Sequence, residues 1–353
     1  MSKRSKRTLW ARAVLTVAVV ASVAAAGWVV ARLRQPYRGF SGAEQFVEIP
    51  QGAGSRTIGE RLVQAGIVRD HVTFRLALWM TGQGRRLRAG EYRFDRAMTP
   101  AQVIDKIARG DVYVIRLTVP EGFSVFDIAQ LFESYGFGTA ASFRAAARDA
   151  SIIHKLDPDA KTLEGYLFPD TYSLPRKTDA AKLVRLMVAE FEHAMTPELV
   201  QAAQARQMSV HQFVTLASIV EKETGAASER PLVAAVYQNR LRIGMLLQCD
   251  PTVIYALELA RRYDGNIHKQ DLSIDSPYNT YRYPGLPPGP IASPGRASLE
   301  AAAHPAAADF LYFVSRNDGT HVFSHTLEEH NYNVQKFQVQ YFRDKRLQEN
   351  HDR

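Results

Sequence analysis

The 353-residue sequence predicts an α+β protein with a single N-terminal transmembrane helix. Three observations support this fold class. An uncharged apolar run covers residues 13–31, a strand–helix–helix–strand pattern covers residues 44–111, and mixed helical and extended patterns continue over residues 112–345. Because 46% of the residues are hydrophobic, a chain of this length can bury a sizeable core and is expected to form two folded units.

Residues 13–31 form the predicted membrane span, since 19 uncharged residues at about 1.5 Å each cross a hydrocarbon core of roughly 30 Å. A cleaved signal peptide is the alternative, because "ASVAAAG" offers small residues to a peptidase. The length of the run and Trp28, placed like an interfacial anchor, favour the span. Five basic residues precede the run and three follow it. This bias predicts a cytoplasmic tail over residues 1–12, a linker over 32–43 and an exported remainder.

Charge and cysteine content exclude several function classes. Residues 1–38 hold eight of the 44 basic residues and no acidic one, so the rest of the chain balances 36 basic against 36 acidic residues. A neutral folded part argues against nucleic acid as a partner. Cys249 is the only cysteine, which excludes an intrachain disulfide. An exported domain without disulfides is typical of the bacterial periplasm, so we expect the chain to be anchored in the inner membrane with this domain in the periplasm. His321, His325 and His330 lack metal-binding spacing, so no metal or cofactor is predicted.

A small subdomain is predicted over residues 44–111. Its strands are "QFVEIPQG" and "GEYRF". Between them lie two predicted helices, "SRTIGERLVQAG", capped by Ser55 and ended at Gly66, and "DHVTFRLALWMTG", ended at Gly82. A further helix, "TPAQVIDKIARG", has Thr99 at its cap. The βααβ order resembles a LysM-like module, a class that binds glycans containing N-acetylglucosamine; a spacer or docking unit is the alternative.

A partial repeat occurs at an offset of 70 residues. "IPQGAGSRTIGERLVQAGI" aligns with "VPEGFSVFDIAQLFESYGF", which matches Gly52 with Gly122 and Gly66 with Gly136. One explanation is that two unrelated amphipathic units have similar sequences by chance. We expect instead a duplicated strand–helix–helix unit, whose second copy leads into the larger domain.

Polar and aromatic residues alternate in "LEGYLFPDTYSL". As a strand, this segment would place Glu164, Tyr166, Phe168, Asp170 and Tyr172 on one face. Such a face suits sugar binding, because aromatic rings stack on a sugar and carboxylates accept hydrogen bonds from its hydroxyls. The alternative is a solvated edge strand.

The segment "VHQFVTLASIVEKETG" predicts an amphipathic helix that ends at Gly225. Glu221 lies at the border of its apolar face, one turn beyond Ser218. Glu223 lies about 200° around a regular helix from Glu221, so only one of the two carboxylates can face a given pocket. Partial desolvation would raise the pKa of Glu221, and we therefore predict this residue as a general acid.

Two loops are predicted to line a groove beside this helix. Gln248 and Asp250 lie at a turn before a helix that begins with Pro251. In "SPYNTYRYPGLPPGPIASPG", the polar residues Asn279, Thr280 and Tyr281 precede a rigid "GLPPG" sequence. Linkers lack aromatic residues of this kind, which favours a binding loop.

Six blocks now carry a specific resemblance. "LEGYLFPDTY", "ASIVEKETG", "ERPLVAAVYQNRLRIGMLLQCDPTVIYAL", "SPYNTYRYPGLPPGPIASPG", "AAAHP" and "LYFVSRNDGTHVFSHTLEEHN" resemble the endolytic murein transglycosylases, the MltG or YceG-like family, between about residues 45 and 335. The resemblance implies a LysM-like subdomain joined to a catalytic domain with a glycan cleft, with Glu221 as the catalytic glutamate of the "EKET" motif. Departures occur at Met245 to Gln248, at Cys249 and at His325, and none changes Glu221.

The implied activity is that of a lyase on peptidoglycan. The resemblance implies an enzyme that cuts the MurNAc–GlcNAc β-1,4 bond inside nascent strands and leaves 1,6-anhydroMurNAc termini. The cut would terminate strand elongation. The implied partners are peptidoglycan synthases such as penicillin-binding proteins. The candidate substrate-binding residues are Glu164, Tyr166, Ser218, Glu223, Gln248, Asp250, Asn279, Thr280 and Tyr281. One carboxyl suffices for this reaction.

Two other functions remain open. A lysozyme-type hydrolase would need a second carboxylate about 5 to 9.5 Å from the first, and Glu164, Asp170, Glu223 and Asp250 are candidates. A non-catalytic glycan-binding scaffold would keep the aromatic groove without an acid. Residues 346–353 are predicted to be a polar C-terminal tail.

Overall fold

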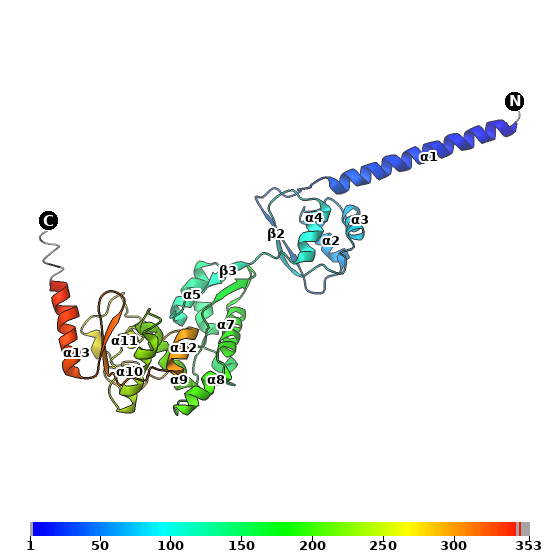
Figure 1. The fold of residues 1–353 in the computed structure, drawn as a ribbon. Helices are drawn as coiled ribbons and strands as arrows, with labels where there is room; N and C mark the ends of the chain where they lie inside the picture. The colour runs from blue at the N-terminus through cyan, green and yellow to red at the C-terminus, as the bar shows by residue number, and fades with distance from the viewer. Residues whose placement is uncertain (1–2, 344–345, 347–353) are drawn as a thin grey trace. The chain divides into compact units, whose positions relative to one another are not determined.

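The computed structural model describes residues 3–343 and residue 346. The chain divides into two compact units, one formed by Met1–Ile115 with Ser173–Arg176, and the other by Arg116–Tyr172 with Lys177–Arg353. The predicted polar tail, residues 346–353, lies outside the described residues except for Arg346. The mixed α+β class predicted from the sequence is confirmed (Figure 1).

The first unit begins with α1, Lys3–Arg34, whose stretch Val14–Arg34 is long and apolar enough to cross a membrane. This stretch is compatible with a single-pass anchor. The helix runs three residues past the predicted end of the span at residue 31, so the predicted linker over 32–43 is shortened at its start.

A two-stranded sheet and three short helices complete the first unit. β1, Gln45–Ile49, pairs antiparallel with β2, Gly90–Phe94. Between the strands lie α2, Ser55–Gln64, and α3, His71–Thr81, and α4, Pro100–Arg109, follows β2. One face of the sheet and the inner faces of the helices form a single apolar core. The strand–helix–helix–strand order predicted from the sequence is therefore present (Figure 1).

With one exception, the capping residues predicted for the helices of the first unit are found in the structure. Thr99 caps α4 through a capping box, and Gly82 ends α3 with φ of 64°, both as predicted. The predicted cap at Ser55 is wrong. Gly54 is the N-cap of α2 and makes no side-chain cap bond, so Ser55 is the first helical residue.

The second unit is mainly helical. Its opening part contains β3, Ile115–Thr118, then α5, Val125–Ser134, α6, Ala140–Ala146, the 3-10 turn η1, Ala150–Ile152, and β4, Thr171–Leu174, which pairs with β3. The helices α7, Ala180–Ala194, α8, Pro197–Ala205, α9, Val210–Glu223, α10, Arg230–Arg242, and α11, Asp250–Leu259, follow. Last come η2, Asp271–Ser273, α12, Arg296–Ala303, the antiparallel pair β5, Tyr312–Ser315, and β6, His321–Ser324, then α13, Leu327–Val334, and the π-helix η3, Gln335–Gln340.

Helix α9 is the central element of the second unit. All eight residues from Phe213 to Val220 are buried. The helix packs against α8, α10, α11 and α12, which explains why residues on every side of it are buried (Figure 1). It ends at Glu223, with Thr224 as an extended C-cap, two residues before the predicted end at Gly225.

The predicted strand over Glu164–Tyr172 is wrong. Only Thr171–Leu174 form a strand, and the preceding residues make turns. Gly165 has a φ of 85°, outside the β region, and Tyr166 and Leu167 are both fully buried. The alternation of residue types therefore does not correspond to two faces.

The sequence repeat corresponds to a structural repeat. β1–α2–α3 and β3–α5–α6 have the same order, and each is followed by a strand that pairs with its first strand. The matched glycines adopt the same left-handed conformation, with φ of 76° and 74° at Gly52 and Gly122 and of 69° and 74° at Gly66 and Gly136. The conserved backbone angles explain why these positions match in sequence.

Candidate active site

Glu221 forms a buried ion pair at the C-terminal turn of α9. Its Oε1 lies 3.3 Å from Arg230 Nη2, and its Oε2 accepts a hydrogen bond of 2.9 Å from the Gly295 backbone N–H. Its side chain is only 5% exposed. Arg230 also lies 3.7 Å from Glu121. Both carboxylate oxygens of Glu221 are thus held by partners within the protein.

Glu223, two residues later, faces a different environment. Its Oε1 accepts a hydrogen bond of 2.6 Å from the Tyr237 hydroxyl, and the buried Cys249 lies beside it. Burial raises the pKa of Glu223, and this effect outweighs the hydrogen bonds from Cys249 and Tyr237, which lower it. Glu223 is therefore a carboxyl that keeps its proton to a higher pH than an ordinary glutamate does.

Glu223 lines a cavity of about 290 Å³ in the second unit. The cavity is bounded by α10, by the loop that leads into α11, and by residues from β5 and α13. The other lining residues are Tyr237, Arg240, Leu247, Gln248, Asp250, Tyr281, Phe313 and His330. Four of the predicted site residues, Glu223, Gln248, Asp250 and Tyr281, therefore come together here. Glu221 is not among the residues that line this cavity.

The cavity wall contains a strained residue. Gln248 has a φ of 50°, although it is not a glycine, and its N–H donates to the Thr280 carbonyl at 3.1 Å. Such conformations are concentrated at functional sites, where the surrounding structure enforces them. Tyr281 donates a hydrogen bond of 2.6 Å to Asp250 Oδ1, which joins the two predicted loops across the cavity.

Asn279 and Thr280 are buried behind the wall. The Asn279 amide donates to the carbonyls of Leu272 and Ile274 at 3.0 and 2.8 Å. The Thr280 hydroxyl accepts from the Cys249 N–H at 3.0 Å. Both side chains are less than 2% exposed, so they fix the loops that carry Gln248 and Tyr281 and do not face the cavity.

Ser218 and Tyr166 do not line the cavity either. The Ser218 hydroxyl donates to the Thr215 carbonyl at 2.7 Å and accepts from the Ile291 N–H at 3.1 Å. The Tyr166 hydroxyl donates to Asp157, which also contacts His211 Nδ1 at 3.0 Å. Ser218 was predicted one turn from Glu221, and Tyr166 on the sugar-binding face of a strand. In the structure, both hydroxyls face inward and hold loops against α9.

Glu164 is a buried carboxyl whose hydrogen bonds give it a structural role. It accepts bonds of 3.1 Å from the Val125 N–H, at the first turn of α5, and from the Tyr255 hydroxyl. Burial raises its pKa to about 8. It lines a separate cavity of about 150 Å³. This group is not a member of the Glu223 site.

Five residues of the cavity were not predicted: Tyr237, Arg240, Leu247, Phe313 and His330. Tyr237 and Arg240 lie three positions apart on α10, a spacing that places them on one helix face. Arg240 donates bonds of 2.7 Å to the carbonyls of Leu311 and Leu247, which hold β5 and the strained loop together. Phe313 and His330 come from β5 and α13, far along the chain, and no local pattern marks them.

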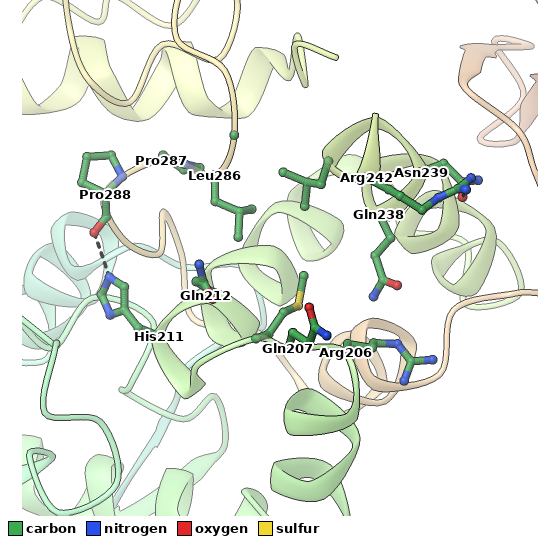
Figure 2. A pocket seen from close by; sticks show the side chains of 13 residues that line it. Arg206, Gln207, His211, Gln212, Gln238, Asn239, Arg242, Leu286, Pro287 and Pro288 are labelled. Carbon is green, nitrogen blue, oxygen red and sulfur yellow. Dashed lines mark hydrogen bonds between the residues drawn. The ribbon is translucent and has the colours of Figure 1, made fainter. Parts of the chain in front are cut away.

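A further, larger cavity lies near the other end of α9 and measures about 820 Å³ (Figure 2). Arginines, amides and the "GLPPG" loop surround it, and Figure 2 shows the bond of 2.8 Å between His211 Nε2 and the Pro288 carbonyl. The lining residues are Arg206, Gln207, Met208, His211, Gln212, Gln238, Asn239, Leu241, Arg242, Gly285, Leu286, Pro287 and Pro288. No member of the predicted substrate-binding set lines it.

Two of the three histidines considered as metal ligands have carboxylate partners. His321 Nδ1 lies 2.7 Å from Glu229, and His325 Nδ1 lies 2.8 Å from Asp309. Within the described residues, no group of three or more His, Cys, Asp or Glu side chains is arranged to hold a metal ion.

Comparison with known proteins places the chain in a family. The model of the YceG-like family matches residues 47–336. The chain belongs to the YceG-like family. The endolytic murein transglycosylase of Bacillus subtilis is 33% identical to this YceG-like chain over 307 residues, which cover 82% of the chain and 84% of the relative. The endolytic murein transglycosylase of Streptococcus pneumoniae is 30% identical over 323 residues, with 82% of the chain and 57% of the relative covered.

A solved structure shows the same family relation. The crystal structure of a YceG-like protein from Listeria monocytogenes matches with a TM-score of 0.57 and 33% identity. The match covers 82% of this YceG-like chain and 99% of that protein. The fold described above is therefore shared with the full length of a solved relative.

Proposed function

We propose that this YceG-like protein is a membrane-anchored endolytic peptidoglycan transglycosylase. Two relatives carry the name endolytic murein transglycosylase. The observation that carries the proposal is a desolvated glutamate in a polar cavity. Glu223, with its raised pKa, lines that cavity together with Gln248, Asp250 and Tyr281.

Glu223, in place of Glu221, acts as the general acid in this proposal. A carboxyl that keeps its proton protonates the oxygen of the MurNAc–GlcNAc β-1,4 bond as the bond breaks. The resulting carboxylate takes the proton of the MurNAc C6 hydroxyl while that oxygen bonds to C1 and closes the 1,6-anhydro ring. No water is consumed, and the proton removed from C6 restores Glu223 for the next cycle.

Glu221 supports the site without contacting the sugar. Its bonds to Arg230 and to the Gly295 N–H connect the end of α9 with the starts of α10 and α12. These bonds fix the last helical turn, from which Glu223 projects. We infer that Glu221 is a positioning residue.

Gln248, Asp250 and Tyr281 bind the sugar in this proposal. Their amide, carboxylate and hydroxyl groups match the hydroxyl and N-acetyl groups of peptidoglycan sugars. Asn279, Thr280, Ser218, Tyr166 and Glu164 hold the surrounding loops. Asp250 is also the carboxylate that a hydrolase mechanism would use, because it lines the same cavity as Glu223.

The experiment compares two matched glutamine variants of the full chain in detergent on purified sacculi. Glu223→Gln keeps the side-chain size but removes the proton donor, so the release of anhydro-ended fragments should fall by about 10² to 10⁴. Glu221→Gln keeps the acid, and its rate per folded molecule should fall far less. The opposite order of losses would return the acid role to Glu221. Reducing ends in place of anhydro ends would establish the hydrolase, and binding to sacculi with no cleavage would indicate the glycan-binding scaffold.

We further propose the cellular setting. The apolar helix α1 supports a single-pass anchor in the inner membrane, with the N-terminus in the cytoplasm and the chain after α1 in the periplasm. The βααβ order of the first unit supports a LysM-like, glycan-binding role. An anchored enzyme that cuts nascent strands would work beside peptidoglycan synthases such as penicillin-binding proteins.

A further inference from the structure

Helix α3 of the first unit has two apolar faces. Phe74, Ala77 and Leu78 face the core. On the outer side, Val72 is 76% exposed, Trp79 is 79% exposed and Met80 is 61% exposed. Together with Leu76, these residues form a continuous stripe, because positions 72, 76, 79 and 80 share one side of a helix. We call this stripe the outer face of α3. A stripe of large exposed apolar side chains indicates an interaction surface.

The start of α3 is attached to the end of α1. Arg32 Nη1 of α1 donates a bond of 2.7 Å to Asp70 Oδ2, and Asp70 is the N-cap of α3. The Arg32 guanidinium also lies 4.5 Å from the centre of the Trp28 ring. A cavity of about 370 Å³ is lined by α1 and α3 together. Its lining residues are Trp28, Val29, Arg32, Leu33, Asp70, Val72, Thr73 and Leu76.

This attachment places the outer face of α3 beside the boundary of the membrane span. The apolar stretch of α1 ends at Arg34, and a tryptophan followed by arginines is typical of the interfacial end of a span. Val72 and Leu76 of the outer face share a cavity with Trp28 and Leu33 of α1. The outer face of α3 is therefore continuous with the apolar surface of the span.

The charges around α3 favour an anionic surface. Residues 71–90 contain four arginines and no acidic residue. Arg75 lies on α3, and Arg85 and Arg86 follow it; all three are exposed. Apolar residues on one side with arginines at the edge are the pattern of helices that lie in the headgroup region of anionic bilayers.

We propose that the outer face of α3 inserts into the headgroup region of an anionic lipid bilayer, next to the point where α1 leaves it. Val72, Leu76, Trp79 and Met80 contact the upper acyl chains, while Arg75, Arg85 and Arg86 contact lipid phosphates. The first unit is then held on the membrane by two elements. This proposal rests on α1 as a span and is independent of the catalytic roles of Glu221 and Glu223.

The test uses Trp79 as a reporter of depth. The chain has three tryptophans, so Trp10→Phe with Trp28→Phe leaves Trp79 alone in the full chain. The protein is reconstituted into vesicles of phosphatidylcholine and phosphatidylglycerol. Trp79 fluorescence should be blue-shifted, quenched by lipids with a doxyl group near the headgroup, and protected from iodide. Emission typical of tryptophan in water, open to iodide and insensitive to doxyl lipids, would overturn the proposal.

Two sets of variants provide the controls. Val72→Asp with Met80→Asp, in the single-tryptophan chain, alters only exposed positions and should abolish doxyl quenching while the far-ultraviolet circular dichroism stays unchanged. Persistent quenching in that variant would contradict the proposal. Arg75→Gln with Arg85→Gln and Arg86→Gln should weaken the quenching in anionic vesicles. The blue shift could also decrease as the protein is diluted in lipid, with no doxyl quenching. That result would show that the outer face of α3 contacts a second copy of the protein, and it would overturn the proposal.

Discussion

At the scale of single residues, Glu221 and Glu223 show how surroundings divide two carboxylates that are neighbours in sequence. The partners of Glu221 are a guanidinium and a backbone N–H, whereas those of Glu223 are a hydroxyl and a buried thiol. Burial disfavours the charged form of a carboxyl, and neutral donors offset this effect only in part at Glu223. Burial raises the pKa of Glu223, which is the basis of its proposed acid role.

The pH dependence of activity tests this assignment. An acid with a raised pKa keeps the enzyme active toward neutral pH, and activity falls as the pH rises through that pKa. Tyr237→Phe removes a hydrogen bond that stabilises the carboxylate of Glu223, so the pKa should rise further and the alkaline limb of kcat/KM should move to higher pH. Tyr281→Phe is the control, because its hydroxyl bonds to Asp250. A limb that moves to lower pH in Tyr237→Phe would contradict the assignment.

Glu164 gives a second prediction, for stability. Its folded-state pKa of about 8 lies above the ordinary value of 4.5, so between these values the folded state keeps a proton that the unfolded state has lost. The stabilisation is complete below about pH 4.5 and is lost as the pH rises to about 8, with a slope of at most about 1.4 kcal/mol per pH unit. Glu164→Gln should flatten this decline in urea unfolding measured at several pH values. A decline that is unchanged in the variant would show that Glu164 titrates normally.

At the scale of secondary structure elements, the predictable parts of the fold are those that depend on neighbouring residues. Thr99 and Gly82 were predicted because a cap acts within one turn of its helix. The α9 helix was predicted from its period, although its burial on every side was not. The strand over Glu164–Tyr172 failed because Gly165 breaks the extended conformation, and the alternation of residue types carries no information on φ.

In the candidate site, too, the predictable residues are those that local sequence marks. Glu223, Gln248, Asp250 and Tyr281 were predicted because each belongs to a polar loop or helix end with a recognisable sequence. Phe313 and His330 lie in β5 and α13, and only the fold brings them to Glu223. The two glutamates differ in their partners, Arg230 and Tyr237, whose positions in space the sequence does not reveal.

Gly165 supplies the prediction at this scale. A Cβ there would overlap the Pro290 ring and lie 3.2 Å from Val214 Cγ1, and the φ of 85° is strained for any L side chain. Gly165→Ala should therefore lower the free energy of unfolding by about 3 kcal/mol or more, from strain and overpacking together. Gly136→Ala is the matched control, because its φ is 74° with no atom near the added Cβ, and it should cost about 1 kcal/mol. Equal losses in urea unfolding would contradict the proposed overlap.

At the scale of the whole molecule, the chain combines a duplicated unit with a helical extension. Both copies of the strand–helix–helix unit keep the left-handed glycines that their turns require. The second copy is followed by α7 to α13, which build the Glu223 cavity. The proposed site therefore lies in the part of the chain that has no counterpart in the first strand–helix–helix unit.

The distribution of charge along the chain gives the last prediction. Five basic residues precede the span and three follow it, while the rest of the chain is neutral, so the N-terminus is expected in the cytoplasm. A reporter enzyme that is active only outside the cytoplasm should be active when fused after Arg353 and inactive when fused at Met1. Replacing Lys3, Arg4, Lys6 and Arg7 with glutamine leaves one basic residue before the span, and a fraction of the chains should then invert. The reverse pattern in the unaltered chain would place the Glu223 cavity in the cytoplasm, away from the glycan strands, and would remove the proposed substrate.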